Sequence, residues 1–143
     1  LFRSVALSEP LPQAAYAPAV SAQVFEGLRA RAQRALDAGA SVLVDAVHGR
    51  AEERDAVAEV AHGCGVRFDG LWLEAPVERL VERVRARRGD ASDADEAVVR
   101  AQLESETGPI HWRRLDAALA PDGLVERARD ALDLEARVLA DPD

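Results

Sequence analysis

The stretch Ser41–Val47, SVLVDAV, constrains the fold more than any other part of the chain. It is short, apolar and rich in β-branched residues, which is typical of a strand buried on both faces of a parallel sheet. Parallel strands need a long crossover, usually a helix, so helices should flank this one. Apolar residues recur at near-helical spacing from Val20 to Leu36, and Gly39 is placed to end that helix.

The same alternation continues along the chain. A helix is predicted over residues 51–61, and FDGLWLEA, residues 68–75, is the next strand, followed by a helix whose first turn suits Pro76. Three more elements are predicted: a helix from about Asp93 to Glu106, a short strand within RRLDAAL, and a last helix from Pro121 to Ala140. Strands that alternate with helices indicate one α/β domain with right-handed crossovers.

The charge balance argues against two classes of partner. The net charge is −8, from 26 acidic and 18 basic residues. Nucleic acid and anionic membranes both demand a basic surface, so neither is an expected partner. No apolar run reaches the ~18 residues that a membrane span needs. The mixture of Ala, Arg, Asp, Val and Leu suggests a bacterial genome rich in G and C.

Residues that bind metals are few and scattered. His48, His62 and His111 are not at the spacing of zinc ligands, so we predict no metal site among the side chains. Cys64 is the single cysteine and has no partner for an internal disulfide, which fits a cytoplasmic protein.

Lysine and methionine are absent from the chain. All 18 basic residues are arginine. The phosphate-binding loop GxxxxGK[ST] requires a lysine that reaches the nucleotide phosphates, so this chain contains no such loop. Because no methionine occurs even at position 1, we expect the chain to be a piece of a longer product.

Asp45 is the candidate catalytic residue. It ends the apolar strand, and ligands bind α/β sheets at the carboxyl ends of the strands. In phosphoryl transfer, an aspartate there holds the magnesium ion or its waters, or takes the proton from the attacking hydroxyl. The structural alternative is an aspartate that caps the next loop, and the pattern alone does not separate the two. His48 and Arg50 follow at the same edge, as do Glu74 and Pro76 after the next strand.

A second candidate group lies on and just after the helix that follows Pro76. It consists of five arginines: Arg79, Arg83, Arg85, Arg87 and Arg88. A planar guanidinium suits phosphate oxygens, so a lid that carries several would cover a nucleotide and neutralise its charge. The alternative is a solvated helix face, on which Glu82 pairs with Arg79 and Arg85. We favour pairing for those two and phosphate binding for the other three.

Three stretches together resemble a known family. SVLVDAVHGRAEERDAV, FDGLWLEAPVERLVERVRARRGDASDADEAVVRAQ and WRRLDA are similar to a P-loop kinase-like ATPase domain of bacteria. Relatives of that domain include gluconate kinase, chloramphenicol phosphotransferase and the zeta toxins. It is often the C-terminal half of a two-domain protein, behind an aminoglycoside phosphotransferase-like half. The resemblance covers about residues 11–118, and RRGDASDA is its most specific part.

The resemblance implies a three-layer α/β P-loop NTPase-type fold that uses ATP and Mg²⁺ to phosphorylate a small-molecule acceptor. Residues 1–143 would be the C-terminal part of one domain, with a lid over about residues 79–106. The implied roles are catalysis for Asp45, nucleotide binding for the lid arginines, and acceptor binding for two basic positions after the strand. The lid arginines are Arg83, Arg87 and Arg88, and the acceptor positions are Arg50 and Arg54.

The sequence departs from the family where the phosphate-binding loop should be. We expect that loop, with its central strand, to lie before Leu1, so that the fold is truncated at its N-terminus here. A sheet without that strand would expose two apolar edges. Two other hypotheses stay open: a degenerate, non-catalytic kinase fold that regulates or docks another domain, and, against the acidic charge, a kinase that processes nucleic acid.

Overall fold

The computed structural model describes residues 18–86 and 96–133 of the 143-residue chain. Their helices and strands are α1 (Pro18–Asp37), α2 (Ala51–Gly63), β1 (Leu71–Glu74), α3 (Val77–Ala86), α4 (Glu96–Glu104), β2 (Arg113–Asp116) and α5 (Pro121–Leu132). The described chain is therefore an α/β fold, as the alternating pattern predicts.

Helix ends follow the local sequence. Gly39 takes a left-handed φ of 80°, and its N–H donates to the Leu36 carbonyl at 2.8 Å, which confirms the predicted end of α1. Glycine reaches that conformation without a Cβ clash. At the C-terminal end, Asp133 adopts φ 51° directly after α5. The last helix therefore ends at Leu132 and not at Ala140, and residues 134–143 lie outside the described part.

Strands β1 and β2 form a parallel pair. Leu71 lies opposite Arg113, and Glu74 lies opposite Asp116. The ladder extends past both ends, because the Arg113 N–H donates to the Gly70 carbonyl at 2.9 Å and the Ala117 N–H donates to the Glu74 carbonyl at 2.7 Å. Both strands were predicted at these places, and both carboxyl ends reach the same edge of the sheet.

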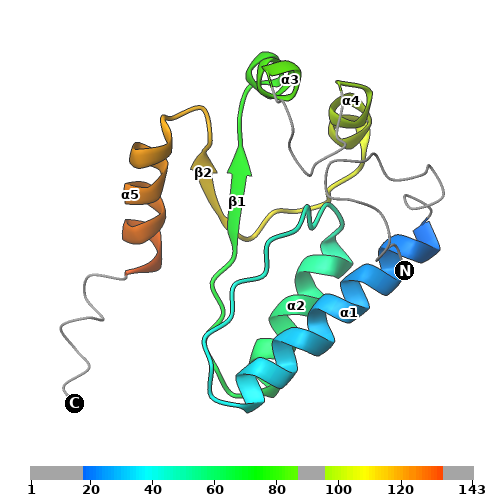
Figure 1. The fold of residues 1–143 in the computed structure, drawn as a ribbon, viewed down its shortest axis with the longest axis vertical. Helices are drawn as coiled ribbons and strands as arrows, with labels where there is room; N and C mark the ends of the chain where they lie inside the picture. The colour runs from blue at the N-terminus through cyan, green and yellow to red at the C-terminus, as the bar shows by residue number, and fades with distance from the viewer. Residues whose placement is uncertain (1–17, 87–95, 134–143) are drawn as a thin grey trace.

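The strand predicted at Ser41–Val47 does not form among the described residues. The segment is extended but unpaired, and Figure 1 shows it as a loop after α1. Leu43 is 92% exposed and Val47 61% exposed, whereas the prediction placed both in a sheet interior. A strand needs a neighbour for its backbone N–H and C=O groups, and in the described part β1 pairs with β2 alone.

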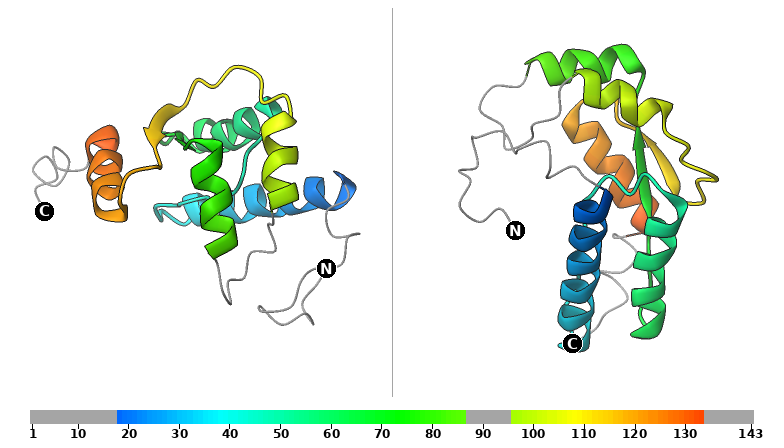
Figure 2. Two further views of the ribbon diagram at one scale, coloured as in Figure 1. Left: turned by 90° about the horizontal axis from the view of Figure 1, so that it is seen from above. Right: turned by 90° about the vertical axis from the view of Figure 1, so that its right-hand side faces the viewer.

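The helices lie on both sides of the two strands (Figures 1 and 2). Helices α1 and α2 pack against each other on one side, and α5 packs against β2 on the other, which gives three layers. Helices α3 and α4 pack together beyond the carboxyl ends of the strands. The buried apolar residues are mostly small: Ala32, Val57, Ala61, Val81, Val99, Leu115 and Ala117. The core is accordingly thin.

None of the helices in residues 18–86 and 96–133 combines the length and the apolar character needed to cross a membrane.

Candidate functional site

The carboxyl edge of the sheet carries acidic side chains. An open cleft there is lined by Glu74, Ala75, Pro76 and Asp116. Glu74 accepts a hydrogen bond from Arg114 Nη1 at 2.6 Å, and Asp116 Oδ1 accepts one from the Ala118 N–H at 2.8 Å. Both carboxylates are therefore partly engaged, in an ion pair and in a turn. None of the predicted site residues lines this cleft.

Asp45 is exposed in the extended segment between α1 and α2. Its carboxylate forms no hydrogen bond or ion pair with any residue that the structure describes. The loop-capping alternative therefore finds no support in its contacts. A free carboxylate at this place keeps its full capacity to accept a proton or to bind waters of a magnesium ion.

Arg50 is exposed at the start of α2. Its backbone N–H donates to Glu53 Oε2 at 3.2 Å, which fixes the entry into the helix. Its side chain is exposed on the same segment as Asp45.

Arg54 has a different environment from the one predicted for an acceptor-binding residue. It is only 3% exposed. Nη1 donates to the carbonyl oxygens of His48 and Gly49, and Nη2 donates to those of Thr107 and Pro109. Because burial and four backbone carbonyls occupy this guanidinium, the structure gives Arg54 a structural position and not one that an acceptor would reach.

His48 belongs to this region; the sequence placed it at the same edge as Asp45 but gave it no role. Its ring lies 5.2 Å from the Phe25 ring and 5.4 Å from the Trp112 ring, measured between centroids. Its backbone is left-handed, with φ 44°, and the side-chain Nδ1 is buried without a hydrogen-bond partner among the described residues. Burial lowers the pKa of His48 below its ordinary 6.5. The one available signal was His48–Gly49, since His adopts left-handed backbone more readily than most residues.

The arginines of α3 differ in their partners. Arg79 Nη1 lies 3.0 Å from Glu82 Oε2, which confirms that predicted pair. Arg85 does not pair with Glu82 but with Glu96 on α4, so its predicted partner was wrong. Arg83 is exposed, and its side chain has no hydrogen bond or ion pair within the described ranges. Arg83 therefore keeps its guanidinium available for a ligand.

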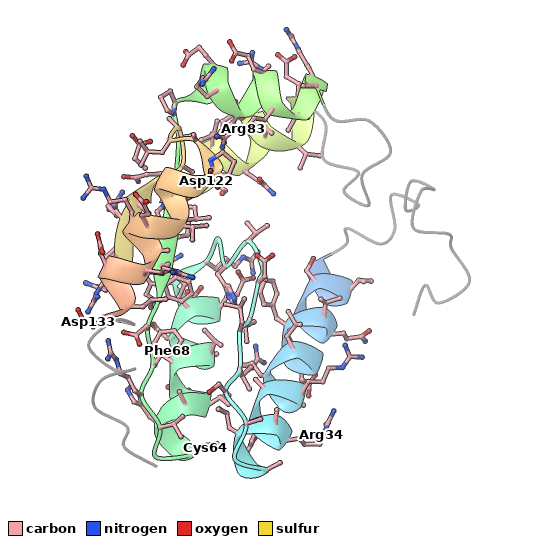
Figure 3. The ribbon with its side chains drawn as sticks, turned by 60° about the vertical axis from the view of Figure 1, so that its left-hand side comes forward. Arg34, Cys64, Phe68, Arg83, Asp122 and Asp133 are labelled. Atoms are coloured by element: carbon pink, nitrogen blue, oxygen red, sulfur yellow. The ribbon has the colours of Figure 1, made fainter. Side chains whose placement is uncertain are left out.

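The remaining lid arginines, Arg87 and Arg88, lie outside the described residues. Helices α3 and α4, between which they occur in the sequence, stand beyond the carboxyl ends of β1 and β2 (Figures 1 and 2). Figure 3 labels Arg83 on α3, at the end of the molecule opposite Cys64. This is the side from which a lid would cover a ligand at the sheet edge.

Over residues 18–86 and 96–133, no cluster of three or more His, Cys, Asp or Glu side chains is arranged to hold a metal ion. The residues that suit ATP and Mg²⁺ are instead single groups with free donors or acceptors. Arg83 offers a guanidinium for phosphate oxygens, and Asp45 offers a carboxylate. Neither replaces the lysine of a phosphate-binding loop, which the chain lacks.

Comparison with known proteins adds one finding. A family model described as an AAA domain matches residues 2–109. That match covers most of the chain and includes Asp45, α2, β1, α3 and α4. No curated protein and no solved structure gives a significant match.

Proposed function

Because the chain belongs to the AAA-domain family of kinase-like P-loop NTPases, we propose that it is the acceptor- and nucleotide-facing part of a small-molecule kinase. The observation that carries the proposal is the arrangement at the sheet edge. Two parallel strands end there, α3 and α4 stand beyond it, and α3 presents Arg83, which has no partner in residues 18–86 and 96–133. Ligands of α/β sheets bind at this edge.

In the proposed reaction, ATP is the phosphoryl donor and Mg²⁺ neutralises charge on its phosphates. Asp45 accepts the proton of the attacking hydroxyl or orients waters of the metal, Arg83 with Arg87 and Arg88 binds phosphate oxygens, and Arg50 faces the acceptor. The free carboxylate of Asp45 supports the first role, because no described side chain competes for it. The acceptor is a small molecule with a hydroxyl group.

A phosphate-binding loop must come from residues other than these, because the chain has no lysine. We propose that its strand enters the sheet between Ser41–Val47 and β1. The 92% exposure of Leu43 and the absence of any partner for β1 but β2 in the described part support this place. Insertion would pair both segments and bury their apolar side chains.

The finer assignments follow from the sequence. We propose a bacterial, cytoplasmic protein whose relatives are gluconate kinase, chloramphenicol phosphotransferase and the zeta toxins, joined covalently to an aminoglycoside phosphotransferase-like domain. The acidic net charge of −8 supports a small-molecule acceptor over nucleic acid or a membrane surface.

The second candidate function is a degenerate kinase fold that regulates or docks another domain. Such a fold needs no phosphate-binding loop, so the absence of lysine from residues 1–143 is compatible with it. The two candidates differ in what precedes the chain: a kinase requires GxxxxGK[ST] there, whereas a docking module does not.

Thermal unfolding with and without ATP-Mg²⁺ tests the proposal on the polypeptide that includes the upstream residues. Ligand at 100 times its Kd stabilises a folded protein by about 2.7 kcal/mol, so the melting temperature should rise. A variant with the loop lysine replaced by alanine is the control and should not respond. An unchanged melting temperature for the wild type at millimolar nucleotide would favour the docking module.

Turnover tests the role of Asp45. Asp45→Asn keeps the size of the side chain and removes its basicity, so phosphoryl transfer should slow by roughly 10²–10⁴-fold. Undiminished transfer would remove Asp45 from the catalytic machinery.

A further inference from the structure

We infer that Arg54 is a positioning residue for the phosphoryl transfer proposed above, on which this inference rests. Arg54 would act without touching ATP or the acceptor. It fixes the segment that carries Asp45 and Arg50 to the segment that follows α4.

The geometry is that of one guanidinium between two loops. Nη1 donates to the carbonyl oxygens of His48 at 2.9 Å and Gly49 at 3.1 Å. Nη2 donates to the Pro109 carbonyl at 3.1 Å and to that of Thr107. We call these five residues the Arg54 bracket. The second loop lies 53 to 55 residues from Arg54 in the sequence, so the bracket is a tertiary contact and not a helix cap.

Burial and charge show how much this arrangement depends on the guanidinium. Arg54 is 3% exposed and forms no ion pair with a described carboxylate. Its Cζ also lies over the Trp72 ring, 5.4 Å from the ring centroid. A buried cation without a counter-ion is retained only where hydrogen bonds compensate its lost hydration. Four carbonyl oxygens and an aromatic face provide that compensation here.

The planar fork of arginine matches this task and an ammonium group does not. Each terminal nitrogen of Arg54 serves a different loop. A lysine ammonium is a single point with three donors, so it satisfies one loop and leaves the carbonyls of the other without a donor.

The bracket lies next to both parts of the proposed site. His48 follows Asp45 by three residues and has the left-handed φ of 44°, so the carbonyl that Arg54 holds marks a sharp turn in that segment. On the other side, Thr107 follows the end of α4 at Glu104 by three residues. The Arg54 side chain therefore fixes the position of the segment that carries Asp45 relative to the loop that follows α4. Transfer rates respond steeply to small displacements of reacting groups.

Hydrogen exchange tests whether the bracket holds the two loops. The variant is Arg54→Lys, and the matched control is Arg34→Lys on the exposed face of α1, at the far end of the molecule from α3 in Figure 3. In Arg54→Lys, amide exchange in residues 46–50 and 107–111 should rise by about tenfold or more, and that in α5 should rise less. Unchanged exchange in both loops, or an equal rise in all elements, would overturn the inference.

Kinetics separate positioning from support of the fold. In the polypeptide that carries the phosphate-binding loop, Arg54→Lys should lower kcat per folded molecule by about ten- to a hundredfold. The KM for ATP should stay near that of Arg34→Lys, because Arg54 does not contact the nucleotide. Loosened loops with an unchanged kcat would show a purely structural role and overturn the inference, while the proposed function would stand. A wild type without any transfer would overturn the function itself, whatever the exchange shows.

Discussion

Arg85 on α3 donates two hydrogen bonds to one carboxylate oxygen of Glu96 on α4, from Nε at 2.9 Å and from Nη2. The second oxygen of Glu96 accepts from Arg100 Nη2 at 2.8 Å. One carboxylate is thus shared by two guanidinium groups on different helices. The hydrogen bonds from Arg100 and Arg85 hold the pKa of Glu96 below its ordinary value.

Neutralising Glu96 should separate α3 from α4. A carboxylate with a lowered folded pKa stabilises the fold above its unfolded pKa, near 4.3, and that contribution is lost as pH falls through the folded pKa. Glu96→Gln should therefore melt below the wild type at neutral pH, and the difference should shrink in strong acid. Glu82→Gln is the control, because Glu82 pairs with Arg79 inside one helix. Equal melting of Glu96→Gln and Glu82→Gln at neutral pH would contradict a link between the helices.

Gly70→Ala should destabilise the fold through Trp112. A Cβ at position 70 would overlap three atoms of the Trp112 ring. Overpacking of this kind costs about 1–3 kcal/mol, to be measured as the change in the free energy of unfolding by urea. Gly27→Ala in α1 is the matched control, since its Cβ meets nothing within 4 Å. It should stabilise the helix by roughly 0.5–1 kcal/mol. Equal effects at both positions would show that Trp112 moves aside.

Acidification should weaken the region around His48. Burial lowers its pKa most, the charge of Arg54 lowers it further, and Glu53 and Asp45 act in the opposite direction. A group with a lowered folded pKa stabilises the fold above its unfolded value, near 6.5, so stability should fall as pH drops below that value. His48→Asn tolerates left-handed backbone but does not titrate. Its stability profile should be flatter than that of the wild type between about pH 7 and 5, and parallel profiles would contradict the assignment.

Arg83→Gln should weaken nucleotide binding. The guanidinium of Arg83 has no partner in the part of the chain that the structure describes, and losing one charge-assisted hydrogen bond to phosphate lowers affinity by roughly tenfold. Arg79→Gln is the control, because Arg79 already pairs with Glu82 on the same helix. Calorimetric titration with ATP-Mg²⁺ on the polypeptide that includes the phosphate-binding loop measures both. If both variants lose the same affinity for ATP, the loss comes from the lower positive charge of α3 and not from a contact of Arg83.

Local signals in the sequence predicted most helices and both paired strands. Gly39 ends α1 where its conformational freedom suggests, and Pro121 begins α5. The apolar stretch around Trp72 does form β1. These elements follow from backbone preferences and from apolar spacing, which act over a few residues.

Long-range contacts were the part that the sequence did not reveal. Arg54 looked like an exposed basic residue, because no neighbouring residue in the sequence indicates that it binds the carbonyl oxygens of Thr107 and Pro109, more than 50 residues away. The Arg85 pair was missed for the same reason, since i±3 and i±4 spacing considers one helix only. The segment around Leu43 has the composition of a buried strand, but burial also needs a neighbour, and composition does not supply one.

In the described part of the chain, one edge of β1 has no paired strand and Leu43 is exposed, and both features affect how the protein behaves in solution. An unpaired strand edge beside exposed apolar side chains is a template for pairing with the same segment of another molecule. At high concentration the isolated chain should therefore aggregate into β-rich assemblies. Co-expression with the residues that pair with this strand edge should prevent the aggregation.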